Sequence, residues 1–231
     1  VIQGMLCRRT DGTSLPSLSL PDRYLPFSSI GKSFAENNIC EMGYAVSKIY
    51  ARSIIEEFSI RFDENIHCLE DLLFMYQYLL HCDYLVLNHM QNYVYVKHSF
   101  SLSHRIHSFE SEYCCFVKYQ QLLAEMMKVW KIPAGDMVVT VNSMLVPFRR
   151  ALKSDYQPDR TIPREMRVKH LKRMISESRD VFLKYYHPVF KTDKLGKVLL
   201  GFNCYILYDF YIRLLFRLNI GPVFYGPKHM Y

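Results

Sequence analysis

The sequence has 231 residues, of which half are hydrophobic and 15% are aromatic. This composition supports a packed core in one ordinary domain or two small ones, and it excludes a largely disordered chain. The formal charge of +7 is uneven: residues 1–105 hold 9 Lys+Arg and 11 Asp+Glu, whereas residues 106–231 hold 20 and 11. The basic second half is compatible with an anionic lipid or other acidic surface, or with a solvated helical face.

The first half alternates between strand-like and helix-like segments. Val1 is not an initiator Met, and Val1 to Cys7 resemble a strand already in progress, so we expect a piece of a longer protein. In chain order, the pattern predicts a strand over 1–9, a turn at 11–14, a proline- and serine-rich loop or flap over 15–38, a helix over 48–57, a helix over 70–81, and strands over 84–88 and 91–97.

The second half is predicted to be helical throughout. Apolar residues recur at intervals of three and four, which favours helices over 106–130, 136–153, about 163 to 186, and 195–218. The last segment is long enough to cross a bilayer but carries too many polar residues for that assignment. It is either a buried bundle helix or a helix lying on a membrane with Arg213 and Arg217 at the headgroups.

The seven cysteines form no CxxC pair and no spacing typical of a zinc site. Their number is odd, and most lie in apolar surroundings. Buried free thiols in a reducing compartment fit this pattern best.

An adjacent acidic pair, Glu70 and Asp71, opens the apolar run that starts at Leu72. Acidic side chains suit the first turn of a helix, where unpaired N–H groups and the dipole favour negative charge. Taken alone, the pair is a common signal for the start of a helix. A carboxylate fixed at that position at the edge of a cleft can also serve as a general base.

The order of the neighbouring motifs adds a second observation. Lys48-Ile49-Tyr50 precedes an Ile60-Arg61-Phe62 turn; the Glu-Asp-Leu-Leu-Phe helix start follows, then Tyr84–Leu87, a Tyr93-Val94-Tyr95 strand, and a Ser101-Leu102-Ser103 turn. This order, over about residues 42 to 105, resembles the acceptor half of bacterial glycosyltransferase family 2 enzymes, which have the GT-A fold. One departure is Leu69, because many relatives carry Gly before the acidic pair.

The resemblance implies an α/β fold class: a partial GT-A sheet with helices over residues 1–105, followed by an all-α extension over residues 106–231. The chain as a whole is then mainly helical. In the family, a carboxylate of the Glu-Asp pair takes the proton from the acceptor hydroxyl, which makes Asp71 the expected base. Glu70 is expected to orient the acceptor or the local hydrogen bonds. Lys48, Tyr95, His98 and Ser101 are expected at the substrate, although a solvated lysine, a surface histidine and a turn-capping serine are the plainer alternatives for three of them.

The family also holds Mg²⁺ or Mn²⁺ on an Asp-x-Asp motif beside the nucleotide. This sequence contains no Asp-x-Asp, so the metal ligands are expected mostly outside the chain, and residues 1–231 alone are expected to be inactive. Hard divalent cations need several oxygen ligands.

The resemblance therefore implies part of an inverting, nucleotide-sugar-dependent transferase that makes a surface polysaccharide or lipid-linked glycan. Its partners are expected to be the nucleotide-sugar donor and a glycan acceptor, in the cytoplasm or at the inner face of the cell membrane. The alternative is a helical module for self-association or membrane docking. Nucleic acid is not expected, because the basic segment from Arg164 to Arg173 has no interleaved aromatic residues and no recognised motif.

Overall fold

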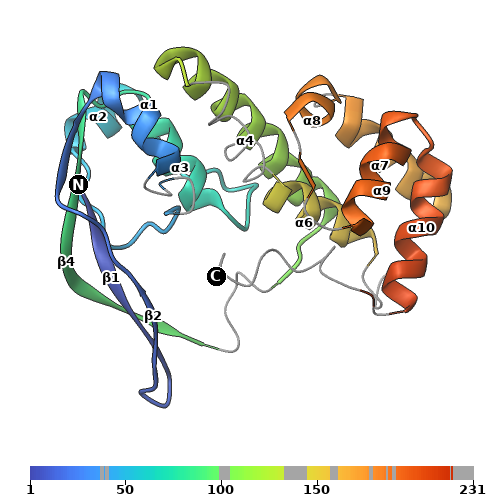
Figure 1. The fold of residues 1–231 in the computed structure, drawn as a ribbon, viewed down its shortest axis with the longest axis horizontal. Helices are drawn as coiled ribbons and strands as arrows, with labels where there is room; N and C mark the ends of the chain where they lie inside the picture. The colour runs from blue at the N-terminus through green and yellow to red at the C-terminus, as the bar shows by residue number, and fades with distance from the viewer. Residues whose placement is uncertain are drawn as a thin grey trace. The chain divides into compact units, whose positions relative to one another are not determined.

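The chain divides into two compact units in the computed structural model. The first combines Val1–Arg105 with Gln121–Asp136, and the second combines Ile106–Gln120 with Met137–Tyr231. The structure describes residues 1–36, 39, 42–98, 105–132, 145–156, 161–176, 179–185, 187–188, 191–218 and 220. The first unit contains a mixed sheet with helices, and the described elements of the second are helical, so the chain is of the α/β class and mainly helical (Figure 1). The helix α4 (Phe109–Trp130) contributes residues to both units.

The sheet has four strands in the order β2-β1-β4-β3. They are β1 (Ile2–Arg9), β2 (Ser14–Leu18), β3 (Arg23–Pro26) and β4 (Tyr84–Lys97). The two central strands, β1 and β4, run parallel, and each outer strand is antiparallel to its neighbour. The predicted first strand and turn are confirmed: Gly12 takes a positive φ of 86° between β1 and β2, a conformation that glycine adopts without strain.

The two strands predicted over 84–88 and 91–97 form one long strand with an irregularity between them. Gln3 of β1 pairs with Asn88, but Met5 pairs with Tyr93, so the β4 backbone bulges where it passes Gly4. A side chain on Gly4 would lie 2.8 Å from the Leu18 carbonyl oxygen and 2.9 Å from Gln91. Glycine therefore permits the close approach of the strands at this bulge.

The loop predicted over 15–38 is wrong, because this segment forms β2, β3 and α1 (Phe27–Glu36). The prolines that favoured a loop lie where a sheet tolerates them. Pro16 is on the edge strand β2, and Pro26 ends the edge strand β3 directly before the helix. Ile30 and Phe34, one helical turn apart, are fully buried and hold α1 in the core.

The helix predicted over 48–57 is shorter than expected: α2 spans Arg52–Glu57. The residues before it are extended along the start of β1. Ser47 accepts a hydrogen bond from the Gln3 N–H at 2.9 Å, and the Ile49 N–H donates to Val1 at 3.0 Å. Lys48 is therefore held by backbone pairing with Ile2, not by a helical turn. The next predicted helix is confirmed as α3 (Glu70–Leu79).

The second unit contains the helices predicted in the basic half, with more breaks than expected. They are the beginning of α4, α6 (Leu145–Asp155), α7 (Arg164–Ser176), α8 (Arg179–Tyr185), α9 (Lys191–Gly201) and α10 (Tyr205–Arg217). The single element predicted over 195–218 is wrong, because Asn203 takes a φ of 56° and separates α9 from α10. Residues 133–144, in which the helix predicted over 136–153 begins, lie outside the described residues. Among the described helices, none combines the length and apolar character that crossing a bilayer requires.

Two buried ion pairs tie the helices of this unit together. Arg150 of α6 donates two hydrogen bonds to Glu112 of α4, at 2.8 and 2.9 Å. Arg167 of α7 pairs in the same two-bonded way with Asp209 of α10, at 2.7 and 2.9 Å, and Tyr156 donates a third bond to Asp209. Each arginine side chain is 9% exposed and each carboxylate 2%, so neither charge has water to replace a lost partner.

We expect Arg150→Met to lower the free energy of unfolding by about 3–5 kcal/mol, because it leaves the Glu112 carboxylate buried without its countercharge. Adding Glu112→Gln should recover most of that loss, since the remaining pair is neutral. Urea denaturation of both variants measures this. Arg52→Ala is the control, because its ion pair with Glu56 is exposed and should be worth well under about 1 kcal/mol. A double variant no more stable than Arg150→Met would contradict this account.

Candidate functional site

The candidate site lies at the start of α3, where the acidic pair stands. Leu69, the residue before the helix, takes the left-handed conformation with φ 66° and ψ 14°. This conformation costs a residue with a Cβ roughly 1–2 kcal/mol and suits glycine. Position 69 is the one at which many members of glycosyltransferase family 2 carry glycine and this chain carries leucine. The backbone conformation at this position favours glycine.

Asp71 is held largely out of water in the first turn of α3. Its Oδ1 accepts a hydrogen bond from the Leu72 N–H at 2.8 Å, and the backbone of Ala45 also donates to it. Burial raises the pKa of Asp71, and the neighbouring charge of Glu70 raises it further, against the lowering effect of these hydrogen bonds and of Lys48. Asp71 is therefore a stronger base than an ordinary aspartate while its backbone contacts keep it fixed.

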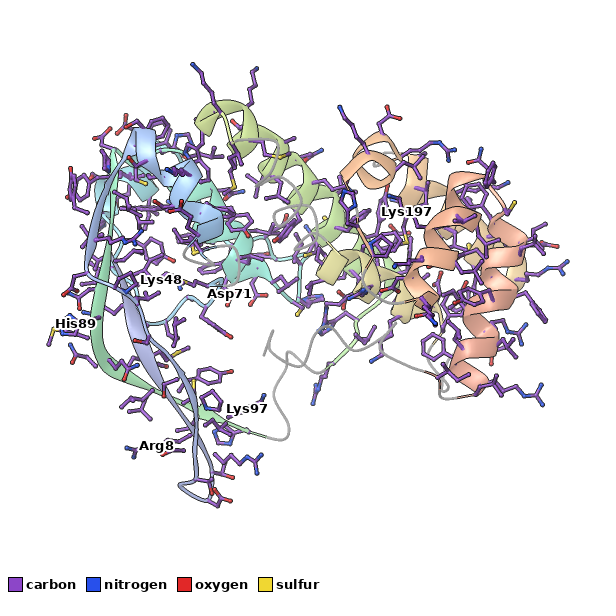
Figure 2. All side chains as sticks on the ribbon, viewed as in Figure 1. Arg8, Lys48, Asp71, His89, Lys97 and Lys197 are labelled. Carbon is purple, nitrogen blue, oxygen red and sulfur yellow. The ribbon has the colours of Figure 1, made fainter. Side chains whose placement is uncertain are left out.

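Lys48 is the cation whose charge acts on Asp71, and Figure 2 labels both side chains. Burial lowers the pKa of Lys48 to about 8, although the charge of Asp71 acts in the opposite direction. The ammonium group donates hydrogen bonds to the carbonyl oxygens of Tyr44 and Val46. Lysine and aspartate are thus brought together from segments more than twenty residues apart, and the lysine remains mostly protonated at neutral pH.

Tyr50 is a member of this cluster that sequence reasoning did not assign to the site. Its ring makes edge contacts with Phe74 and Tyr78 of α3, with ring centroids 5.4 and 4.8 Å apart. Its hydroxyl is buried without a hydrogen-bond partner among the described residues. Burial raises the pKa of Tyr50, and the charge of Asp71 raises it further, so the phenol stays protonated and able to donate. Lys48 forms a β-bridge with Ile2, and Ile49 is 64% exposed between the half-buried Lys48 and Tyr50. This alternation places Lys48 and Tyr50 on the same side of the chain, which the predicted helix over this segment did not indicate.

The other residues predicted at the site have no described contact with Asp71. Tyr95 lies on β4, where its ring contacts Tyr44, whose carbonyl oxygen receives the Lys48 hydrogen bond. His98 follows β4 and is exposed. In the part of the chain that the structure describes, the groups that shift the pKa of Asp71 are Glu70, Leu72, Lys48 and Ala45, so His98 is not among them. Ser101 lies outside the described residues.

Metal-ligating side chains occur across the part of the chain that the structure describes. Within the described ranges, no three His, Cys, Asp or Glu side chains are grouped as a metal ion would require. The described cysteines, which exclude Cys40, are free thiols, and Cys68, Cys82 and Cys115 are buried. The site therefore consists of the Asp71, Glu70, Lys48 and Tyr50 cluster.

Comparison with known proteins found no match to the chain among protein families, curated proteins or solved structures.

We expect Leu69→Gly to be more stable than Leu69→Ala by about 1 kcal/mol. Both variants lose the leucine side chain, but only glycine also removes the Cβ that opposes the left-handed backbone. At an ordinary helical position the order is reversed, with alanine favoured by about 1 kcal/mol. Thermal and urea unfolding of the pair measure the difference. Equal stabilities, or the ordinary order, would show that φ at Leu69 is not positive in solution.

Asp71→Asn should raise the free energy of unfolding at about pH 7. Because the pKa of Asp71 is raised in the folded protein, the ionised carboxylate destabilises the fold above that pKa, and this cost disappears once the group is protonated. The gain from asparagine should therefore shrink as the pH falls toward about 4. Urea denaturation at the two pH values measures it.

Asp22→Asn is the matched control. The pKa of Asp22 is lowered, mainly by the hydrogen bond from the His89 N–H, so its carboxylate stabilises the fold and asparagine should reduce stability at neutral pH. An Asp71→Asn protein that loses stability at about pH 7, as Asp22→Asn does, would contradict the raised pKa.

Proposed function

We propose that Asp71 is the general base of an inverting glycosyl transfer from a nucleotide sugar to a glycan acceptor. The observation that supports this most is the state of the Asp71 carboxylate: fixed by backbone hydrogen bonds at a helix start, desolvated and more basic than usual. A base for a sugar hydroxyl needs this combination of a fixed position and a raised pKa. The ordered motifs around it, which resemble glycosyltransferase family 2, supply the substrate class.

The neighbouring side chains fit the same chemistry. Tyr50 stays protonated, and its buried phenol helps to keep the Asp71 carboxylate desolvated and therefore basic. Lys48 carries a positive charge next to the carboxylate and can bind a phosphate or an acceptor hydroxyl. Glu70 keeps a second negative charge close to the base and sustains its raised pKa.

This proposal requires a nucleotide-binding half that this sequence does not contain. The sequence has no Asp-x-Asp pair, so Mg²⁺ or Mn²⁺ and the donor diphosphate would be held by a part of the protein outside residues 1–231. Such a metal, when bound, would neutralise the charge of the departing diphosphate. Asp71 has a separate task, which is to take the acceptor's proton as the new glycosidic bond forms and the bond to the diphosphate breaks.

In the natural full-length protein, Asp71→Asn should lower transfer by about 10²–10⁴-fold while donor affinity stays nearly unchanged. Transfer is followed by the release of nucleoside diphosphate, and donor affinity by calorimetry. Glu64→Gln, a carboxylate-to-amide change at an exposed position of the preceding loop, is the control and should retain activity.

Two results would contradict the assignment. One is turnover by Asp71→Asn at the rate of the unchanged protein. The other is an equal loss in Asp71→Asn and Glu64→Gln, which would indicate a general effect of removing negative charge and not the loss of a base.

A further inference from the structure

The helix α10 has two apolar faces, although a helix at the surface of a bundle needs only one. Its inner face is buried and carries Tyr208, Ile212 and Leu215. Five other large apolar side chains of α10 and its C-cap are exposed: Ile206 60%, Leu207 59%, Phe210 67%, Leu214 41% and Leu218 54%. Between 41% and 67% of each of these side chains is exposed, and that apolar surface contributes nothing to the stability of the folded unit.

The five exposed apolar side chains lie on one side of the helix. At 100° per residue, they fall within a single arc together with Arg213 and Arg217, which are also exposed. We call these seven residues the outer face of α10. Both arginines lie toward the same edge of that arc. The only acidic residue in α10, Asp209, is buried on the other side in its ion pair with Arg167.

The element next to α10 has the same character. The helix α9 packs closely on it, since a Cβ on Gly196 would lie 3.1 Å from the Tyr208 ring. Phe202, in the turn between the two helices, is 77% exposed, and Leu195 and Val198 of α9 are about half exposed. Lys191 and Lys194 of α9 are exposed cations. Exposed apolar and basic side chains thus continue from α10 into the preceding turn and helix.

We propose that the outer face of α10 binds the surface of an anionic lipid bilayer. An amphipathic helix that lies in a membrane interface inserts large apolar side chains between the headgroups and places basic residues against the lipid phosphates. The outer face has both features, and it lacks acidic residues that would be repelled. Residues 106–231 carry 20 basic and 11 acidic residues, so the field of this half of the chain also attracts a negative surface.

A second copy of the chain fits this face less well. Two copies related by a two-fold axis would place the same patch against itself and bring Arg213 and Arg217 near their counterparts without an acidic partner.

A spanning helix is excluded by length, because α10 has 13 residues and a bilayer span needs about 20. This inference does not depend on the proposed function, because it uses only residues of the second unit.

The test is the sedimentation of the 231-residue chain with two kinds of vesicle, phosphatidylcholine alone and phosphatidylcholine with phosphatidylglycerol. Binding is expected only to the anionic vesicles, and it should weaken as NaCl rises from about 0.05 to about 0.5 M. Phe210→Ser should weaken binding about tenfold through lost apolar insertion. Arg213→Gln with Arg217→Gln should weaken it about 25-fold, or roughly fivefold for each charge.

The matched control is Tyr24→Ser, which removes an aromatic side chain from β3 in the first unit; Tyr24 is 66% exposed and Phe210 67%. It should bind like the unchanged chain, and circular dichroism melting checks that every variant remains folded. Equal binding to both vesicles, or unchanged binding by a folded Phe210→Ser, would overturn the proposal. So would a concentration-dependent dimer that Phe210→Ser converts to a monomer, since the face would then bind a second copy.

Discussion

The candidate site depends on the backbone pairing of residues 47–49 with the first three residues of the chain. The start of β1 pairs with β4 on one side, and on the other side Val1 and Gln3 hydrogen-bond to Ile49 and Ser47. Ser47 takes a φ of 60°, and its hydroxyl donates to the Gly4 carbonyl oxygen at 2.8 Å. This turn brings Lys48 and Tyr50 to α3, so the position of the cluster is set by the sheet and not by α3 alone.

The same pairing explains why a lysine can be buried next to an aspartate here. Desolvation alone disfavours both charges, and it moves their pKa values in opposite directions, downward for Lys48 and upward for Asp71. Their mutual attraction recovers part of that cost. Two features of the site therefore oppose folding: the desolvated charges of Lys48 and Asp71, and the left-handed backbone of Leu69. The packing of the surrounding core offsets their cost. Such local costs are concentrated where a protein fixes reactive groups.

Sequence patterns predicted the elements whose local signals agree with their tertiary surroundings. The start of α3 was predictable from Glu70 and Asp71, and the first strand from its apolar run. The segment over 15–38 was not, because its prolines indicate a loop unless it is known that β2 and β3 are edge strands. The Lys48–Tyr50 segment was mistaken for helix for a related reason: its extended form comes from pairing with β1, 46 residues earlier in the chain, which no local window contains.

Part of the candidate site could likewise be predicted from the sequence, and part could not. Asp71 and Lys48 were named as candidates because the order of the motifs around them resembles a known family, and not from their residue types alone. The interaction between them, and the involvement of Tyr50, could be found only in the three-dimensional arrangement. In α10 the opposite holds, because the sequence shows an apolar segment with arginines and leaves two interpretations open. Exposure distinguishes them residue by residue: Tyr208, Ile212 and Leu215 are core, while Ile206 and Phe210 are not. The two interpretations, a buried bundle helix and a helix on a membrane, are therefore compatible. One side of α10 packs in the bundle, and the other has the side chains that suit a lipid surface.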